Sequence, residues 1–436
     1  MKSMRPLTIA RVLVVILVVS GFSRTLFAAS CDDKVRAARQ SWGASSHTWF
    51  ASVLRNETVG ISETWCRMFE TSGADRVSKV EDFGRTLFTG DGIHPAVGSI
   101  VAGSGLAAGA SLNLEAALES KPLRLMGIVE GRRATSGFWE AGAQLVLNGS
   151  GDTDDNRHMY AIVSGRHLAL PTLASFGIGD RASLADETTY GLKLTAVSGQ
   201  FTVPVPGGFA FSAGVEGLSA TSTGRVDLSQ ATDHVALGGG IGWRHPIDEV
   251  LRGYRTSVRG QWRAFHAMHG DAASFRRVDA EWIQYWSPDT ASDPGVLTVI
   301  ARLNGSTAAD GHAVPFYLQP TLGGSDIDGV ASLRSFRDYR FRAPNALAFT
   351  LEYEHAIGGL PLGVWGFVDA GQVAERSADF DLGRLRKSYG IGMTLHAGGS
   401  PVVKLYFAWG GGEGSHTTFT GDSNKFGPEG APRGVF

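Results

Sequence analysis

The side chains best suited to chemistry in this sequence are arginines and carboxylates within residues 320–371. An arginine-rich run extends from Arg334 to Arg342, and Glu352 and Asp369 follow it in two segments of alternating polarity. A guanidinium forms charge-assisted, often bidentate hydrogen bonds with carboxylates. If the run folds back over the two segments, we expect Arg334 to pair with Glu352 and Asp369. The alternative is a solvated loop that carries ordinary surface charges.

Motifs for bond-making chemistry are missing from the sequence. It contains no G-x-S-x-G nucleophile elbow, no H-E-x-x-H motif and no paired-cysteine metal motif. His266 and His269 are three residues apart, so in a strand they point to opposite faces and cannot bind one ion together. The 12 histidines leave open a Ser-His-acid set assembled in space, because such a triad has no fixed spacing. We expect a protein that is not an enzyme and needs no cofactor or metal.

Alternating polarity predicts strands on the carboxyl side of the arginine run. Leu351 and Tyr353 share one face of the run 345–355, and Glu352 lies on the other. From residue 362 onward, Phe367 and Asp369 share the face opposite to the smaller apolar residues. A soluble sandwich buries its apolar face, whereas a membrane barrel turns that face to lipid and its polar face to the lumen. Alternation fits both, and an arginine loop that folds inward favours the barrel.

Further amphipathic runs follow one another from residue 93 to residue 426. Ten precede the arginine-rich loop and five follow it, but single-chain bacterial barrels have an even number of strands. Two strands are therefore merged, within residues 93–118 or 163–200, and sixteen is the predicted number. We predict an all-β fold: a transmembrane antiparallel β-barrel of 16 strands with a long inward-folded loop.

A second set of charges is predicted to line the lumen. Arg255, Arg259 and Arg263 share one face of a strand, and Asp279 and Glu281 share a face of the next. An antiparallel neighbour can thus offer carboxylates to a ladder of arginines. Because a charge on the lipid face costs about 2–4 kcal/mol near the membrane midplane, we expect all five side chains inside.

Composition agrees with one large barrel. The chain has 436 residues, a formal net charge of −2 and 58 glycines, and no low-complexity linker follows residue 92. Near-neutral charge argues against a nucleic-acid partner, which would require a basic patch. The glycines of LGGGIGW, residues 237–243, fit either close approach by a plugging loop or a sharply curved wall.

The two ends of the chain carry separate predictions. Residues 1–30 have the basic start and short apolar core of a signal peptide, so we expect export. Residues 31–92 form a short, partly helical periplasmic segment, in which Cys31 is either lipidated or paired with Cys66. Residues 427–436 are a tail with several strand breakers, so we expect Phe426 to close the last strand.

The segment around Arg334 resembles the bacterial surface antigen family, the BamA/TamA superfamily of outer-membrane barrels that includes the transporters of two-partner secretion. The family has an inner-loop motif of the form apolar-Arg-Gly-Phe/Tyr, which Arg334 and Phe336 match. Glu352 matches the glutamate of the first following strand, and Asp369 and Gly371 match the Phe-x-Asp-x-Gly motif of the second. This sequence departs from the family motif at residue 335, where a serine replaces the glycine that freely adopts positive φ.

The resemblance implies a protein of the bacterial outer membrane that contacts its lipids and inserts or translocates client polypeptides. The periplasmic domains that receive clients in the family, called POTRA domains, are not recognisable in residues 31–92. Two alternatives stay open: a channel for small solutes or lipids, and a structural barrel or adhesin of the cell surface.

Overall fold

The computed structural model describes residues 92–118, 123–149, 159–224, 230–244, 254–286, 295–357, 362–397 and 400–421. One antiparallel sheet of 16 strands dominates it, and each of its strands pairs with the next strand of this sheet along the chain. The strands are β1 (Gly92–Gly98), β2 (Ala107–Leu118), β3 (Leu123–Ala134), β4 (Trp139–Gly149), β5 (Tyr160–Ser175), β6 (Thr188–Val205), β7 (Phe209–Thr223), β8 (Gln230–Arg244), β9 (Tyr254–Ala267), β10 (Phe275–Trp286), β11 (Gly295–Ala308), β14 (Asn345–Ala356), β15 (Leu362–Ala374), β16 (Arg386–Ala397), β17 (Ser400–Trp409) and β18 (Ser415–Gly421).

This sheet confirms the predicted all-β fold and the number of strands. The merged strands are β1 and β2, which lie within residues 93–118 apart from Gly92. In the part of the chain that the structure describes, no helix is long and apolar enough to cross a membrane. The predicted signal peptide, Cys31, Cys66, Phe426 and the tail 427–436 lie outside the described residues.

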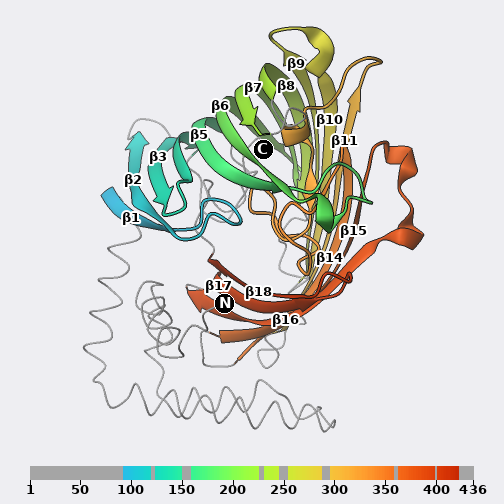
Figure 1. Ribbon diagram of the computed structural model, residues 1–436. Helices are drawn as coiled ribbons and strands as arrows, with labels where there is room; N and C mark the ends of the chain where they lie inside the picture. The colour runs from blue at the N-terminus through green and yellow to red at the C-terminus, as the bar shows by residue number, and fades with distance from the viewer. Residues whose placement is uncertain are drawn as a thin grey trace, which may run out of the picture.

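The sheet curls around the connection between β11 and β14, as Figure 1 shows. We call residues 309–344 the inner loop. It contains a short 3-10 turn, η4 (Phe316–Leu318), and two short strands, β12 (Thr321–Leu322) and β13 (Phe341–Arg342), that pair with each other. The inner loop therefore has a folded structure of its own inside the curve of the sheet.

The two faces of the sheet differ in chemistry as the alternation predicts. Along β7 the burial alternates strictly: Val215 is exposed on the outer face, whereas Glu216 and Leu218 are buried on the inner face. Leu237, Trp262 and similar large apolar side chains are exposed on neighbouring strands. An apolar outer face with a charged inner face is the pattern of a membrane barrel and the reverse of a soluble sandwich.

In the part of the chain that the structure describes, the connections that contact the inner loop lie at one end of the sheet. In an antiparallel sheet every second connection lies at the same end, and the inner loop belongs to this set. We call this side the loop end; the described connections there are residues 99–106, 135–138, 176–187, 268–274, 309–344, 375–385 and 410–414. Leu168, Tyr190 and Phe265 of the wall pack with Phe316 and Leu318 of the inner loop in one apolar cluster.

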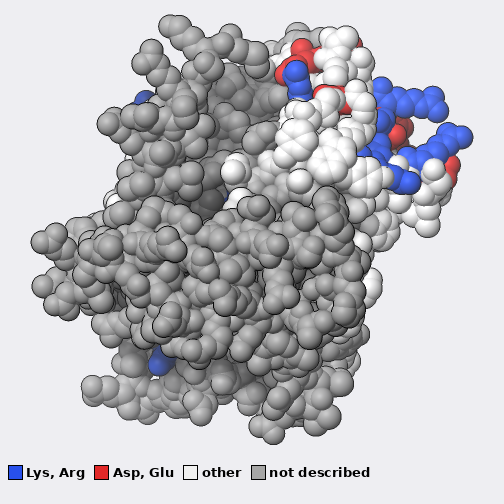
Figure 2. Space-filling view, turned by 90° about the horizontal axis from the view of Figure 1, so that it is seen from below, with Lys and Arg blue, Asp and Glu red and all other residues white. Residues whose placement is uncertain are grey.

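The connection between β15 and β16 projects from the loop end with charges of both signs on it. Figure 2 shows basic and acidic side chains side by side at this margin of the molecule. Arg376 pairs with Asp379, and Arg384 pairs with Asp381. All four side chains are exposed, so these pairs contribute little to stability.

Candidate functional site: the inner-loop lock

Arg334 extends from the inner loop to two carboxylates on the wall. Its Nε lies 3.0 Å from Oδ2 of Asp369 and its Nη2 lies 2.7 Å from Oδ1, which is a bidentate pair. Nη1 lies 2.5 Å from Oε1 of Glu352. Arg334 and Asp369 are 5% and 1% exposed, so the pair is shielded from water. We call Arg334, Glu352 and Asp369 the lock.

The strands position both carboxylates by alternation. Thr350 on β14 pairs in register with Asp369 on β15, and the Thr350 hydroxyl donates to Oδ1 of Asp369 at 3.1 Å. Glu352 lies two residues along β14 and therefore on the same inner face. The backbone N–H of Arg334 also donates to Oδ2 of Asp369, at 3.0 Å. Asp369 thus accepts four hydrogen bonds, so both of its buried oxygens have partners.

The guanidinium of Arg334 lies over two aromatic rings of β15. Cζ of Arg334 lies 3.5 Å from the ring centre of Phe367 and 5.1 Å from that of Trp365, both on β15. Gly390 and Gly392 on the neighbouring strand make room for these rings: a Cβ at Gly390 would come within 2.2 Å of the Phe367 ring. A planar guanidinium stacks on aromatic faces, whereas a lysine ammonium cannot reproduce this geometry.

The backbone turn at the lock does not require a glycine at position 335. Ser335 does not have a positive φ; the left-handed conformation falls on Leu333, with φ of 45°. The N–H of Ser335 donates to Oγ of Ser388 at 2.7 Å, and its hydroxyl donates to the carbonyl of Gly410 at 3.4 Å. A serine at this position therefore needs no unusual backbone, and its hydroxyl ties the inner loop to the β17–β18 connection.

Phe336 and Gly371 complete the set of motif residues. Phe336 is buried, and its ring meets that of Phe341 edge-on with 5.1 Å between centres. It lies against Gly411, where an added Cβ would come within 1.9 Å of the ring. At Gly371 a Cβ would lie 3.1 Å from Leu322 of the inner loop. Both glycines thus permit close approach of the inner loop to the wall.

The inner loop has further polar contacts that the sequence analysis missed. Arg340 pairs with Glu413 at 2.6 Å and donates to the carbonyl of Ala182 at 2.8 Å. Arg342 donates to the Tyr190 hydroxyl at 3.0 Å, and Arg340 and Arg342 are both buried. The dense arginine run was the available signal, but it did not indicate the partners of each guanidinium.

At its tip the inner loop reaches the wall opposite the lock. Asp328 lies 3.4 Å from Arg166 on β5. Arg166 pairs with Glu140 on β4, which pairs with Arg132 on β3, both at 3.1 Å. The tip thus joins a line of alternating charges on three adjacent strands, and the inner loop is held at two separate parts of the sheet.

The predicted lumen charges lie on neighbouring strands and form pairs. Nη2 of Arg263 lies 2.7 Å from Oδ2 of Asp279, and Nη2 of Arg259 lies 3.2 Å from Oε1 of Glu281. Arg302 on β11, which the sequence analysis did not single out, binds the other oxygen of Glu281 at 2.8 Å. The Arg255 side chain lies outside the described residues.

Candidate sites for metal or nucleophile chemistry do not emerge from this geometry. The described ranges contain no group of three or more His, Cys, Asp or Glu side chains that could hold a metal ion. His266 is on β9, but His269 follows the end of that strand and lies 3.5 Å from Asp233. The arrangement around Arg334 binds and orients the inner loop.

Comparison with known proteins adds a likeness in fold. No protein-family model matches the sequence, and neither does any curated protein. Among solved structures, BamA from Haemophilus ducreyi lacking POTRA domains 1–3 matches 75% of this chain over 68% of its own, with a TM-score of 0.52 and 15% identity. The fold is that of BamA-type barrels. CdiB from Escherichia coli matches 76% of this chain over 62% of its own, with a TM-score of 0.51 and 13% identity.

Proposed function

We propose that this protein is an outer-membrane β-barrel that acts in the insertion or translocation of polypeptides at that membrane. Its fold is similar to those of BamA and CdiB barrels. Its exposed apolar outer face suits contact with membrane lipids. Pairing between strands satisfies the backbone groups that lipid cannot. The role requires no bond chemistry, which agrees with a site made of ion pairs.

The observation that carries the proposal is the buried lock. The resemblance noted in the sequence assigns an arginine, a glutamate and an aspartate to an inner-loop contact, and here Arg334 lies 2.7 Å from Asp369 and 2.5 Å from Glu352. A solvated loop would not bury a guanidinium to 5% exposure beside two carboxylates. The lock holds the inner loop against the last strands of the sheet.

In the proposed mechanism the ends of the sheet receive the client. β1 and β18 are the end strands, each with seven described residues. An end strand presents backbone N–H and C=O groups to which another chain can add by strand pairing. The inner loop contacts β14, β15, β16 and the β17–β18 connection, so it braces the wall next to β18 while that end strand exchanges partners.

Depletion of the protein tests the proposal. The outer membrane is compared by quantitative proteomics before and after depletion, and after complementation with wild type or with Arg334→Ala. We expect specific outer-membrane or secreted proteins to be lost, and wild type to restore them more fully than Arg334→Ala. An unchanged proteome would contradict an assembly role, and recovery of the protein in the soluble periplasm would contradict the barrel location.

The channel alternative makes a different prediction. At the loop end, Phe316, Tyr317 and Leu318 of the inner loop pack against the wall, so the inner loop lies on the path of a solute through the lumen. Planar-bilayer recordings distinguish the two functions. High steady conductance of the wild type, together with no effect of depletion on other proteins, would favour a channel.

A further inference from the structure

Glu216 is the exception among the carboxylates of the inner face. It is 1% exposed, and in the part of the chain that the structure describes neither of its carboxylate oxygens has a hydrogen-bond partner. Asp279 and Glu281, by contrast, are each bonded to an arginine. A buried carboxylate without hydrogen bonds is costly unless something else supplies positive charge and donors.

A small recess, open on one side, lies beside Glu216 on the inner face of β6 to β9. Its floor is made by glycine: Gly214 pairs in register with Gly238, Gln200 continues this row on β6, and Arg263 continues it on β9. The two facing glycines carry no side chain, and Arg263 lies over Gly238, where an added Cβ would come within 2.7 Å of its Cγ. We call this recess the glycine niche.

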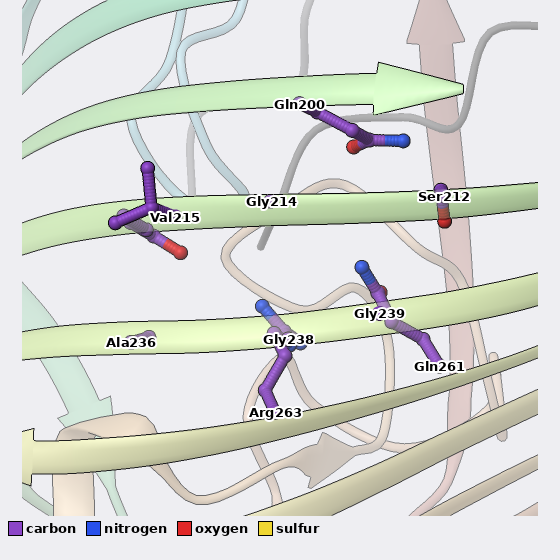
Figure 3. Close-up of a pocket in the computed structure, with 10 residues that line it drawn as sticks. Gln200, Ser212, Gly214, Val215, Ala236, Gly238, Gly239, Gln261 and Arg263 are labelled. Atoms are coloured by element: carbon purple, nitrogen blue, oxygen red, sulfur yellow. The ribbon is translucent and has the colours of Figure 1, made fainter. Parts of the chain in front are cut away.

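Polar side chains surround the glycine niche. Figure 3 shows Gln261 and Arg263 extending from β9 across the glycines of β8, with Gln200 and Ser212 on the strands beyond. The hydroxyl and the two amides offer oxygen acceptors in addition to the carboxylate of Glu216. The glycines of LGGGIGW therefore line a polar recess.

The apolar cluster limits the niche on the loop-end side. Glu216 pairs with Ala236, which pairs with Phe265, and both partners belong to the cluster that includes Phe316 of the inner loop. Ser212 lies four residues before Glu216 on β7, on the side away from the loop end. The polar lining of the niche therefore lies on the side of Glu216 away from the loop end.

The nearby guanidinium groups are already bound to other partners. Arg263 pairs with Asp279 at 2.7 Å. Arg277 donates to the Ser306 hydroxyl at 3.2 Å and to the carbonyl of Leu318. Neither guanidinium forms a hydrogen bond with Glu216. A ligand with positive charge and N–H donors would supply the hydrogen bonds that Glu216 lacks.

We propose that the glycine niche binds a primary ammonium group, with Glu216 as its counter-ion. An ammonium has a single positive charge and three N–H donors, which suits one carboxylate surrounded by hydroxyl and amide oxygens. A multivalent metal ion is a poorer match, because the described residues offer no cluster of three or more metal-ligating side chains. Two sources share this chemistry: a free small amine and a lysine side chain of a peptide in the lumen.

Binding is tested on the purified full chain in detergent micelles. Methylammonium chloride is titrated while the thermal midpoint is recorded, and tetramethylammonium chloride at equal concentration serves as a salt of the same charge without N–H donors. We expect only methylammonium to raise the midpoint. In Glu216→Gln the apparent affinity should fall roughly 10- to 100-fold, since hydrogen bonds to charged groups contribute about 1.5–3 kcal/mol.

Matched variants separate the niche from general salt effects. Glu281→Gln removes a lumen carboxylate that is already paired with two arginines, so its methylammonium response should equal that of wild type. Gly214→Ala adds a methyl group to the floor and should weaken the response even if Glu216→Gln fails to fold. Equal shifts with both salts, or an undiminished response in Glu216→Gln and Gly214→Ala, would overturn the proposal.

A lysine derivative distinguishes the two sources of the ammonium. Nα-acetyl-lysine methylamide carries the side-chain ammonium as its only charge. If it matches methylammonium, the niche admits a lysine side chain; if only methylammonium acts, the ligand is a free small amine. Either result supports an ammonium site, whereas no response to both compounds contradicts it.

Discussion

Two sets of arginine–carboxylate pairs occupy the inner face of the same sheet, and they differ in how they are made. The lock joins Arg334 of the inner loop to Asp369 and Glu352, with Arg334 5% exposed and stacked on Phe367. The second set, which we call the lumen ladder, pairs Arg259 with Glu281 and Arg263 with Asp279 across β9 and β10. The Arg259 side chain in it is 44% exposed. The hydrogen bonds are similar in length. The burial of Arg334 makes breaking the lock more costly in folding free energy than breaking the exposed Arg259 pair.

The distance between the charged atoms alone does not rank ion pairs by their contribution to stability. Breaking a buried pair leaves an uncompensated charge and costs roughly 3–5 kcal/mol, whereas an exposed pair contributes about 0–1 kcal/mol. In the lock, removal of one guanidinium leaves two carboxylates facing each other. At Arg259, whose side chain is 44% exposed, water can replace the lost partner. Substitutions at Arg334 and Arg259 test this ranking, and substitutions at Gly411 and Ser335 test how the inner loop is seated on the wall.

Arg334→Ala should have the largest effect. We expect it to lower the free energy of unfolding by roughly 3–5 kcal/mol, measured as a shift of the urea or thermal midpoint in micelles. Arg334→Lys should recover only part of the loss, because an ammonium lacks the bidentate geometry. In a double-mutant cycle with Asp369→Ala the effects should be non-additive. Additive effects below 1 kcal/mol would place the arginine in solvent.

Gly411→Ala tests the fit of the inner loop against the β17–β18 connection. Its added Cβ would come within 1.9 Å of the Phe336 ring, whereas at Gly412 nothing lies within 4 Å. Both glycines have positive φ, of 71° and 80°, so Gly412→Ala is a control for backbone strain. We expect Gly411→Ala to cost about 1–3 kcal/mol more than the control, as overpacking does. Equal midpoints for the two variants would mean that Phe336 does not dock there.

Ser335→Gly restores the residue of the family motif and should nevertheless destabilise the protein. Ser335 has no positive φ, so glycine gains nothing in the folded state and increases the entropy of the unfolded chain. It also loses the hydroxyl that donates to Gly410. We expect a cost of about 1 kcal/mol, with Ser335→Ala costing less. A stabilising Ser335→Gly would show that this turn prefers a left-handed residue at position 335.

Arg259→Ala should have the smallest effect, about 0–1 kcal/mol. Glu281 keeps Arg302 as a partner at 2.8 Å, and water reaches the vacated side. The same chemical denaturation series used for Arg334→Ala measures it. A cost comparable to that of Arg334→Ala would remove the distinction between the lock and the ladder.

The strands were predictable from the sequence because their polar and apolar residues alternate. The contacts of the inner loop were not. Alternation placed Glu352, Asp369, Arg259 and Glu281 on inner faces, and the even parity of barrels corrected the strand count to 16. The inner loop has no period that indicates a face, so the contacts of Asp328 with Arg166 and of Arg342 with Tyr190 could not be foreseen. They depend on the path of the chain in space.

The glycine niche illustrates the same limit at a single residue. Alternation on β7 places Glu216 on the inner face, but whether a partner reaches it depends on the residues beside it in register. Its partner in register, Ala236, and the diagonal neighbour Gly238 are defined only when the pairing of β7 with β8 is known. An unpaired carboxylate therefore has no signature in the sequence alone.

The attachment of the inner loop to distant parts of the chain has a consequence for the order of folding. Tyr339 donates to the carbonyl of Ala102, and Arg340 pairs with Glu413. The first contact requires the beginning of the sheet and the second requires its end. Contacts of such long sequence separation form slowly, because loop-closure entropy is lost before they stabilise the chain. The inner loop can thus complete its docking only after β1 to β17 are in place, which makes its docking a late step of folding that reports whether the whole sheet has formed.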